Sequence, residues 1–351
     1  MSFIKKPRIN HPGLDTNAVG LTIQDYEGAM STLCAGCGHD SVSSAIIQAY
    51  YELAIEPHRV AKLSGIGCSS KTPTYFLRTA HGFNAVHGRM PSIATGASAA
   101  NRDLHYIGIS GDGDSLSIGL GQFCHAVRRN VNMLYVIENN GVYGLTKGQF
   151  SASADVGSSA RKGGGTNEIP PIDPVLTAIN FGCSFVARGF SGDKTTLVPL
   201  IKAAILHRGF ALLDVISPCV TFNDHEGSTK SYLHTREFEQ TAVYADFVPI
   251  RDEITANVDT QVTAVTLHDG SQIHLRTVDP DYDPSDRGSV VSYLREHQNQ
   301  GQIVTGLLFV DETAPDMLTL SGTTQTPLVD LSVDTLNPGA GALKTLQKQW
   351  R

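Results

Sequence analysis

Two short segments carry oxygen-bearing groups at a spacing that suits a divalent cation. Gly111-Asp112-Gly113-Asp114 follows an apolar run, and Glu138-Asn139-Asn140-Gly141-Val142 begins 25 residues after Gly113, at the end of the next apolar run. Mg²⁺ prefers near-octahedral oxygen coordination and rarely sheds all of its water. Asp112, Asn140 and the carbonyl group of Val142 would supply three oxygen ligands and leave room for phosphate oxygens and water.

The glycines of the first segment point to a phosphate beside that cation. Gly111 and Gly113 let the backbone come close to a phosphate, and a helix N-terminus after them favours an anion. Gly-Asp-Gly on its own also occurs in ordinary turns. Here both segments end neighbouring predicted strands, where ligands bind in sheets of this kind. The pair resembles the signature of thiamine-dependent enzymes, so we expect thiamine diphosphate and Mg²⁺.

Four cysteines fall beside the same predicted edge of the sheet. Cys34 and Cys37 form a C-x-x-C motif directly before a predicted helix, while Cys68 and Cys219 each follow a predicted strand. Four thiolates can hold a [4Fe–4S] cluster, but a structural zinc site with four cysteine ligands uses the same residues. Spacing alone does not separate iron from zinc. Adjacency to the thiamine site favours the cluster, because an electron acceptor has to lie there and a structural zinc ion does not.

The remaining two cysteines do not fit this group. Cys124 lies on the apolar stripe of its predicted helix, and Cys183 begins a predicted strand at the opposite edge of the sheet. Free cysteine often behaves as a small buried hydrophobic residue. We therefore expect both side chains in the core.

The elements that must position these residues alternate between buried strands and helices. The predicted strands are continuous apolar runs, as expected of strands covered on both faces, over residues 60–64, 106–110, 133–137, 183–187 and 211–216. The predicted helices cover residues 41–53, 115–129 and 195–207, with a further helix beginning at Thr72-Pro73. This alternation predicts an α/β fold with a doubly wound, mostly parallel sheet.

The character of the sequence changes near residue 250. Residues 1–31 lack periodicity and are interpreted as an N-terminal arm, and residues 32–250 as the domain that binds thiamine diphosphate, Mg²⁺ and the cluster. Residues 251–351 are interpreted as a small C-terminal extension. It contains a predicted hairpin around Asp269-Gly270, a helix over 290–297 and an apolar run over 306–310.

Composition argues against several classes of protein. The chain has 351 residues, of which 41% are hydrophobic and 17% charged, as in ordinary folded proteins. The formal net charge of −7 argues against nucleic acid as the main partner. No apolar run approaches the roughly 20 residues that span a membrane, and no secretory signal pattern is present. A cytoplasmic protein without a membrane partner is predicted.

Together, the motifs resemble the β subunit of 2-oxoacid:ferredoxin oxidoreductases. The resemblance runs through residues 34–39, 65–70, 87–89, 111–114, 139–149 and 217–223. It implies one [4Fe–4S] cluster on Cys34, Cys37, Cys68 and Cys219. It also implies reversible, coenzyme A-dependent oxidative decarboxylation of a 2-oxoacid, with electrons passed through the cluster to ferredoxin. The long C-terminal region and residues 217–231 look most like the 2-oxoglutarate branch, whose product is succinyl-CoA.

The resemblance also implies roles for individual residues. Lys71, His87 and Arg89 are expected to act in catalysis, and Lys71, Arg89 and Leu145 to contact the substrate. Lys71 and Arg89 are cations that could pair the second carboxylate of 2-oxoglutarate. A diphosphate contact or a plain surface charge explains either cation equally well. The residues expected to bind thiamine diphosphate are Gly67, Cys68, Ser69, His87, Gly88, Gly111, Asp112, Gly113, Asp114, Asn140, Val142, Gly144, Leu145 and Thr146.

A partner subunit is expected on chemical grounds. Thiamine catalysis needs a carboxylate on the aminopyrimidine ring, which related enzymes supply from a second, similar domain. Only one such domain is recognisable here, so an α subunit is expected to supply it, in an α2β2 heterotetramer. Three alternatives stay open: the same chemistry on pyruvate or another 2-oxoacid, a non-redox thiamine enzyme with a structural zinc site, and a non-enzymatic metal-binding subunit.

Overall fold

The computed structural model describes most of the chain. The described residues are 13–159, 165–248, 262–267, 270–277, 279 and 282–350. The predicted boundary between residues 250 and 251, and Asp269 of the predicted hairpin turn, lie outside this part of the chain.

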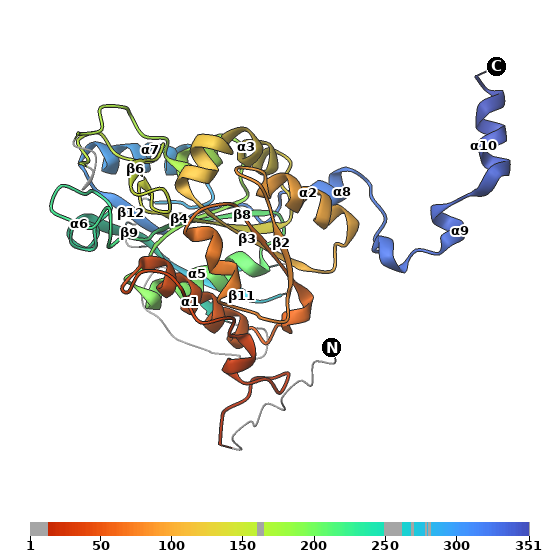
Figure 1. The fold of residues 1–351 in the computed structure, drawn as a ribbon, viewed down its shortest axis with the longest axis horizontal. Helices are drawn as coiled ribbons and strands as arrows, with labels where there is room; N and C mark the ends of the chain where they lie inside the picture. The colour runs from red at the N-terminus through yellow and green to blue at the C-terminus, as the bar shows by residue number, and fades with distance from the viewer. Residues whose placement is uncertain are drawn as a thin grey trace.

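A ten-stranded sheet runs through the part of the chain that the structure describes (Figure 1), in the order β10-β11-β9-β12-β7-β8-β4-β3-β1-β2. The strands from β2 to β7 in this order are parallel, as are β9 and β12, whereas β12 is antiparallel to β7 and the β10-β11-β9 meander is antiparallel. The predicted mostly parallel sheet is confirmed. The strands are β1 Val60–Ser64, β2 His81–Asn84, β3 His105–Gly111, β4 Met133–Asn139, β7 Phe185–Phe190, β8 Phe210–Ile216, β9 Glu239–Val248, β10 Val262–Thr266, β11 Gln272–Thr277 and β12 Ile303–Val310.

Helices cover both faces of this sheet, which confirms the predicted doubly wound arrangement. On one face α1 packs against α5, and on the other α2, α3, α4 and α7 lie in contact with one another in sequence order (Figure 1). The helices are α1 Gly38–Glu52, α2 Met90–Ala100, α3 Leu120–Arg128, α4 Pro174–Asn180, α5 Lys194–Leu206, α6 Tyr232–Phe238, α7 Arg287–Asn299, α8 Met317–Leu320, α9 Val333–Leu336 and α10 Gly339–Lys348.

Two helix predictions need correction. The helix expected to begin at Thr72-Pro73 is wrong, because these residues lie at the end of a 3-10 helix, Ser69–Thr74. The chain then pairs with the segment around Tyr26, where Phe76 forms an isolated bridge with Glu27 and the Leu77 amide donates to the Tyr26 carbonyl. The helix predicted over 115–129 is also divided, because a π-helical turn, Gly113–Ile118, precedes α3. Such turns are frequent at functional sites.

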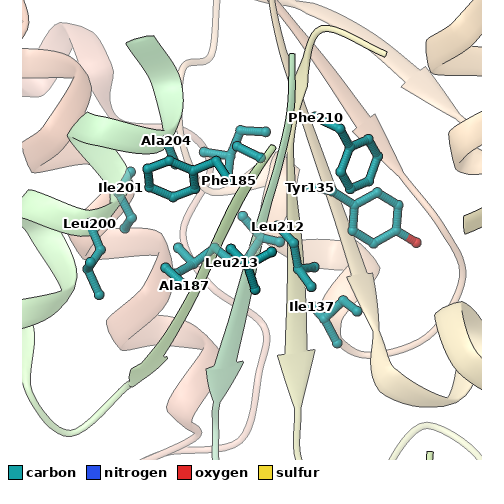
Figure 2. Close-up of a cluster of buried hydrophobic side chains, with 14 of the residues drawn as sticks. Tyr135, Ile137, Phe185, Ala187, Leu200, Ile201, Ala204, Phe210, Leu212 and Leu213 are labelled. Carbon is teal, nitrogen blue, oxygen red and sulfur yellow. The ribbon is translucent and has the colours of Figure 1, made fainter. Parts of the chain in front are cut away.

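The centre of the core lies where α5 packs over β7, β8 and β4 (Figure 2). The rings of Tyr135 and Phe210 stack with centroids 5.7 Å apart and join β4 to β8. Leu200, Ile201 and Ala204 of α5 are almost completely buried over the same strands. This packing fixes β4 and β8, and with them the loops that follow their carboxyl ends.

Strands on both sides of residue 250 belong to one sheet, because β12 lies between β9 and β7. Beyond α8 the chain runs away from the body through α9 and α10 (Figure 1), and no residue of these two helices is buried. Among the described helices, none has the length and hydropathy needed to cross a membrane.

Candidate functional site

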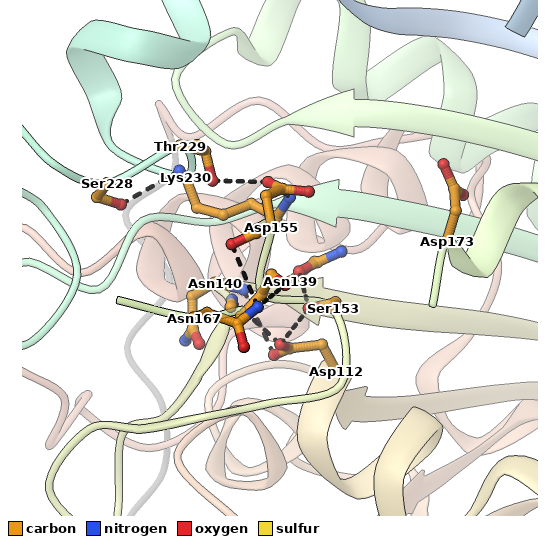
Figure 3. Close-up of polar contacts among 12 residues, drawn as sticks. Asp112, Asn139, Asn140, Ser153, Asp155, Asn167, Asp173, Ser228, Thr229 and Lys230 are labelled. Atoms are coloured by element: carbon orange, nitrogen blue, oxygen red, sulfur yellow. Dashed lines mark hydrogen bonds and ion pairs between the residues drawn. The ribbon is translucent and has the colours of Figure 1, made fainter. Parts of the chain in front are cut away.

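Asp112 and the turn after β4 meet at the carboxyl edge of the sheet (Figure 3). Asp112 follows β3, and its carboxylate accepts hydrogen bonds from the backbone amides of Asn140, at 3.4 Å, and Gly141, at 3.1 Å. The Asn140 side-chain oxygen accepts a bond of 3.1 Å from the Val142 amide. Because β3 and β4 are adjacent and parallel, the three predicted magnesium ligands are brought together in one buried turn.

Two serines complete the surroundings of Asp112. Ser151 and Ser153 donate their hydroxyl protons to the Asp112 carboxylate, the latter at 2.6 Å. Burial raises the pKa of Asp112, and these two hydroxyl groups oppose the rise. The sequence analysis missed both serines, because they follow Asp112 by 39 and 41 residues and polar loop residues leave no periodic signal.

Asp114 ties three neighbouring segments together. Its carboxylate accepts hydrogen bonds from the Gly88 amide at 2.9 Å, the Ser110 hydroxyl at 2.9 Å and the Ile66 amide at 3.3 Å. These donors come from the loop before α2, the end of β3 and the loop after β1. Asp114 therefore holds in place the loops that carry several of the residues expected to bind cofactor.

Glycines let these loops pack closely. A Cβ atom on Gly113 would come within 2.4 Å of the Tyr143 ring, and one on Gly111 within 2.5 Å of the Ser69 hydroxyl oxygen. Gly88 has a φ of +67°, a left-handed conformation that favours glycine. Close packing of protein atoms thus requires glycine at these positions before any ligand is considered.

Two of the four predicted cluster cysteines, Cys68 and Cys219, lie beside Gly144. All four are free thiols, and a Cβ atom on Gly144 would lie 3.6 Å from the sulfur atoms of both Cys68 and Cys219. The segment after Cys34 and Cys37 contacts the segment that carries Cys219, because the Gly38 amide donates to the Pro218 carbonyl at 3.2 Å. In the described part of the chain, no group of three or more His, Cys, Asp or Glu side chains is close enough to hold one metal ion directly.

Cys124 and Cys183 lie in the hydrophobic core, which confirms the prediction for both. The Cys183 thiol donates to the carbonyl groups of Phe185 and Phe210, at 3.1 and 3.2 Å. Both residues belong to the buried packing rather than to the group beside Gly144.

His39 connects the cysteine segment with the turn at Asn140. Its Nδ1 atom lies 2.5 Å from the Ser217 hydroxyl oxygen and 3.5 Å from a Glu138 carboxylate oxygen. Its Nε2 atom lies 3.4 Å from the Asn140 side-chain nitrogen. Burial lowers the pKa of His39 to about 4 and raises the pKa of Glu138 well above its usual range. The His39 imidazole is therefore neutral at pH 7 and acts as a hydrogen-bonded link between the two segments.

Comparison with known proteins agrees with this geometry. Residues 65–215 match the family described as thiamine pyrophosphate enzyme, C-terminal TPP binding domain. The 2-oxoacid:ferredoxin oxidoreductase subunit beta of Saccharolobus solfataricus is 43% identical over 211 residues, which cover 60% of this chain and 67% of that protein. The 2-oxoglutarate oxidoreductase subunit KorB of Mycobacterium tuberculosis is 34% identical over 278 residues, 74% of each chain. This chain belongs to the 2-oxoacid:ferredoxin oxidoreductase beta-subunit family.

A solved structure extends the likeness to most of this beta subunit. The 2-oxoglutarate:ferredoxin oxidoreductase from Magnetococcus marinus, with 2-oxoglutarate, coenzyme A and succinyl-CoA bound, superposes with a TM-score of 0.70 at 30% identity. The likeness covers 87% of this chain and 92% of the other. The beta subunit is therefore part of a thiamine pyrophosphate-dependent oxidoreductase, and the subunit naming implies an alpha partner.

Lys71 and Arg89, the cations predicted to contact substrate, lie on different segments of the beta subunit. Lys71 belongs to the 3-10 helix after Cys68, and its ammonium group donates to the Thr32 hydroxyl at 3.3 Å. His87 and Arg89 are exposed and flank Gly88, which is bonded to Asp114. Lys71 thus follows Cys68 by three residues, whereas His87 and Arg89 flank the glycine whose amide binds Asp114.

The loop after β5 (Val142–Tyr143) carries Leu145 and Thr146, two of the residues predicted to bind thiamine diphosphate. Leu145 is 55% exposed, and the Thr146 hydroxyl donates to the Gln149 side-chain oxygen at 2.6 Å. Gly67, before Cys68, has a φ of +132°, and a Cβ atom there would have no neighbour within 4 Å. The structure thus leaves Leu145 and Gly67 accessible for contact with a bound group.

The thiols of the metal-free beta subunit are expected to react at very different rates. Thiolate is the nucleophile, so a raised pKa and burial both slow alkylation. Cys34 is exposed, whereas burial raises the pKa of Cys37 to about 12 and that of Cys183 to about 12. At pH 8, iodoacetamide should modify Cys34 first, Cys37 slowly and Cys183 only after unfolding, as peptide mass spectrometry would measure. Equal rates for Cys34 and Cys183 would contradict this expectation.

Proposed function

We propose that this chain and an α subunit catalyse the reversible, coenzyme A-dependent oxidative decarboxylation of 2-oxoglutarate to succinyl-CoA and carbon dioxide. Ferredoxin would take the electrons through a [4Fe–4S] cluster. One observation carries the proposal: the Asp112–Asn140 turn and four free cysteines meet at one edge of the sheet. The substrates named for the Magnetococcus enzyme and for KorB of Mycobacterium favour 2-oxoglutarate among the 2-oxoacids.

The donor set at the Asp112 turn fits Mg²⁺ and a diphosphate. Asp112 would supply a carboxylate oxygen, Asn140 its side-chain oxygen and Val142 its carbonyl oxygen, a set of hard oxygen ligands suited to Mg²⁺. Thiamine diphosphate, when bound, supplies an electron sink for decarboxylation. The protein's own part would be to neutralise the diphosphate charge, hold the cofactor at the sheet edge and exclude water.

The position of the cysteine group favours a cluster over a single zinc ion. Four thiolates can hold either group. The sulfur atoms of Cys68 and Cys219 both lie 3.6 Å from where a Cβ atom of Gly144 would be. An electron acceptor has to lie beside the thiamine site, whereas a structural zinc ion does not. Gly144 is two residues from Val142, so a cluster here would adjoin the diphosphate site.

The proposal also includes the domain boundaries, the assembly and the cellular location. Residues 1–31 would be an N-terminal arm, 32–250 the cofactor domain and 251–351 a C-terminal extension. The assembly would be an α2β2 heterotetramer in the cytoplasm, with a role in the reductive TCA cycle when it runs as a carboxylase.

The chain without its partner is expected to be inactive. Its described domain contains no recognisable second thiamine-binding unit to supply the aminopyrimidine carboxylate, so the α subunit has to complete the site. Anaerobic assays of ferredoxin reduction with 2-oxoglutarate and coenzyme A should show turnover for the coexpressed pair and none for the chain alone. Robust turnover by the isolated chain would contradict the two-subunit account, and a pair that uses pyruvate but not 2-oxoglutarate would contradict the substrate.

Lys71 is expected to favour a dicarboxylic 2-oxoacid. A charge-assisted pair with the distal carboxylate is typically worth about 1.5–3 kcal/mol. Lys71→Ile should therefore lower kcat/KM for 2-oxoglutarate by about ten- to a hundredfold, while the value for pyruvate falls less. The measurement is the ratio of the two efficiencies, since loss of cofactor would lower both alike. Lys348→Ile, in exposed α10, is the control. An unchanged ratio in Lys71→Ile would assign the distal carboxylate to Arg89 or to the partner.

A further inference from the structure

The two oxygen atoms of the Asp112 carboxylate have different surroundings. Oδ2 receives three donors: the Gly141 amide at 3.1 Å, the Ser153 hydroxyl at 2.6 Å and the Ser151 hydroxyl at short range. Oδ1 receives one amide, from Asn140, at 3.4 Å. A carboxylate oxygen offers about two lone-pair sites. Oδ2 is therefore saturated by the protein, and Oδ1 is the oxygen left for a cation.

Ser153 has a choice of acceptors, which decides what its hydroxyl group does. Its oxygen also lies 2.9 Å from the Asn139 side-chain oxygen (Figure 3), and the hydroxyl carries one proton. Hydrogen bonds to an ionised acceptor are roughly twice as strong as those between neutral groups. When Asp112 is ionised opposite a cation, its carboxylate therefore takes the Ser153 proton.

A buried chain of hydrogen bonds fixes the side chain of Asn139. The Asn139 side-chain nitrogen donates to Asp214 at 3.0 Å, and Arg188 donates to Asp214 and to Asp173, each at 2.8 Å. Asn139 and Asp214 are almost completely buried, and Arg188 is largely covered. The Asn139 amide therefore cannot turn, and its oxygen remains the acceptor that competes with Asp112 for the Ser153 proton.

We propose that Ser151 and Ser153 are positioning residues that hold Asp112 so that Oδ1 alone faces the bound cation. They act through the carboxylate and do not touch the cation or the substrate. The inference rests on the proposed function, because Mg²⁺ at Asp112 is part of that proposal. Its consequence is that removing either hydroxyl group weakens cation binding even though every predicted ligand remains.

The test measures cation affinity in the coexpressed complex after removal of bound metal with chelator. The quantity is the concentration of free Mg²⁺ that half-saturates retention of thiamine diphosphate. Loss of a group that orients a metal ligand typically costs about ten- to a hundredfold in metal affinity. Ser151→Ala and Ser153→Ala should each raise the half-saturating Mg²⁺ concentration by about that factor.

A matched control separates this role from general stability. Ser184 is equally buried, and its hydroxyl donates to Asn130 at 2.8 Å, at the opposite edge of the sheet. Ser184→Ala should lower the melting temperature without moving the half-saturating Mg²⁺ concentration. If Ser151→Ala and Ser153→Ala both stay within twofold of the parent while Asp112→Ala abolishes retention, the positioning role is wrong and the metal site stands. If Asp112→Ala also leaves retention unchanged, the proposed metal site itself is wrong.

Discussion

Replacing Asp112 with alanine is expected to leave the purified complex without thiamine diphosphate at ordinary magnesium concentrations. Asp112 is the one carboxylate in the proposed ligand set, so its loss leaves the diphosphate charge uncompensated in a buried turn. Groups that only orient a ligand cost about ten- to a hundredfold in affinity, so a direct ligand should cost at least about a hundredfold. The measurement is the amount of thiamine diphosphate released from denatured protein per chain.

Asp316→Ala provides the matched control for this variant. Asp316 is also buried and accepts hydrogen bonds from the Thr319 amide and the Arg208 guanidinium group, at 2.8 and 2.6 Å. It caps α8, away from the carboxyl edge of the sheet. Its replacement should reduce stability and leave cofactor content unchanged. Normal cofactor content in Asp112→Ala would move the diphosphate site elsewhere.

Replacing any one of Cys34, Cys37, Cys68 or Cys219 with serine is expected to remove most of the iron from anaerobically purified protein. Each thiolate would hold one corner of the cluster, and a serine hydroxyl is a poor substitute for a soft thiolate ligand. Cys124→Ser and Cys183→Ser are the controls, because both side chains lie in the core. Iron and labile sulfide per chain are the quantities to measure. Full iron content in Cys219→Ser would contradict the assignment of that ligand.

Sequence patterns predicted the central strands well, because burial on both faces leaves an unbroken apolar run. Val60–Ser64 has the same bounds in the structure as in the prediction, and all five of its residues are buried. The run predicted over 183–187 begins two residues later, at Phe185, since Cys183 and Ser184 belong to the preceding turn. The error is small, since the predicted run only begins two residues before the ladder of hydrogen bonds does, and strand ends are uncertain by one or two residues.

The position of β12 shows what local pattern cannot provide. The sequence shows an apolar run over 306–310, but nothing in it specifies insertion between β9 and β7. Gly306 makes the insertion possible: its φ is +99°, and a Cβ atom there would lie 2.1 Å from the Val243 carbonyl oxygen. The register shifts at this residue, which is typical of a β-bulge. Its contact partner lies far earlier in the chain, beyond the reach of any local pattern.

Within the candidate site, the residues that directly follow parallel strands could be predicted from the sequence. The residues that hydrogen-bond to them could not. Asp112 and Asn140 meet because the carboxyl ends of neighbouring parallel strands share an edge. Ser151 and Ser153 return to Asp112 only after the chain has formed the ribbon of β5 and β6 (Gln149–Phe150), which pairs Val142 with Phe150. That return depends on a two-residue pairing too short to leave a periodic signal.

The most direct test of the proposed function is the visible absorption spectrum of the anaerobically purified complex, recorded before and after addition of 2-oxoglutarate and coenzyme A. A [4Fe–4S] cluster beside a working thiamine site should give a brown chromophore that 2-oxoglutarate bleaches and that Asp112→Ala leaves unbleached until dithionite is added. A colourless protein that contains zinc, or a brown protein that dithionite bleaches and 2-oxoglutarate with coenzyme A does not, would contradict the account.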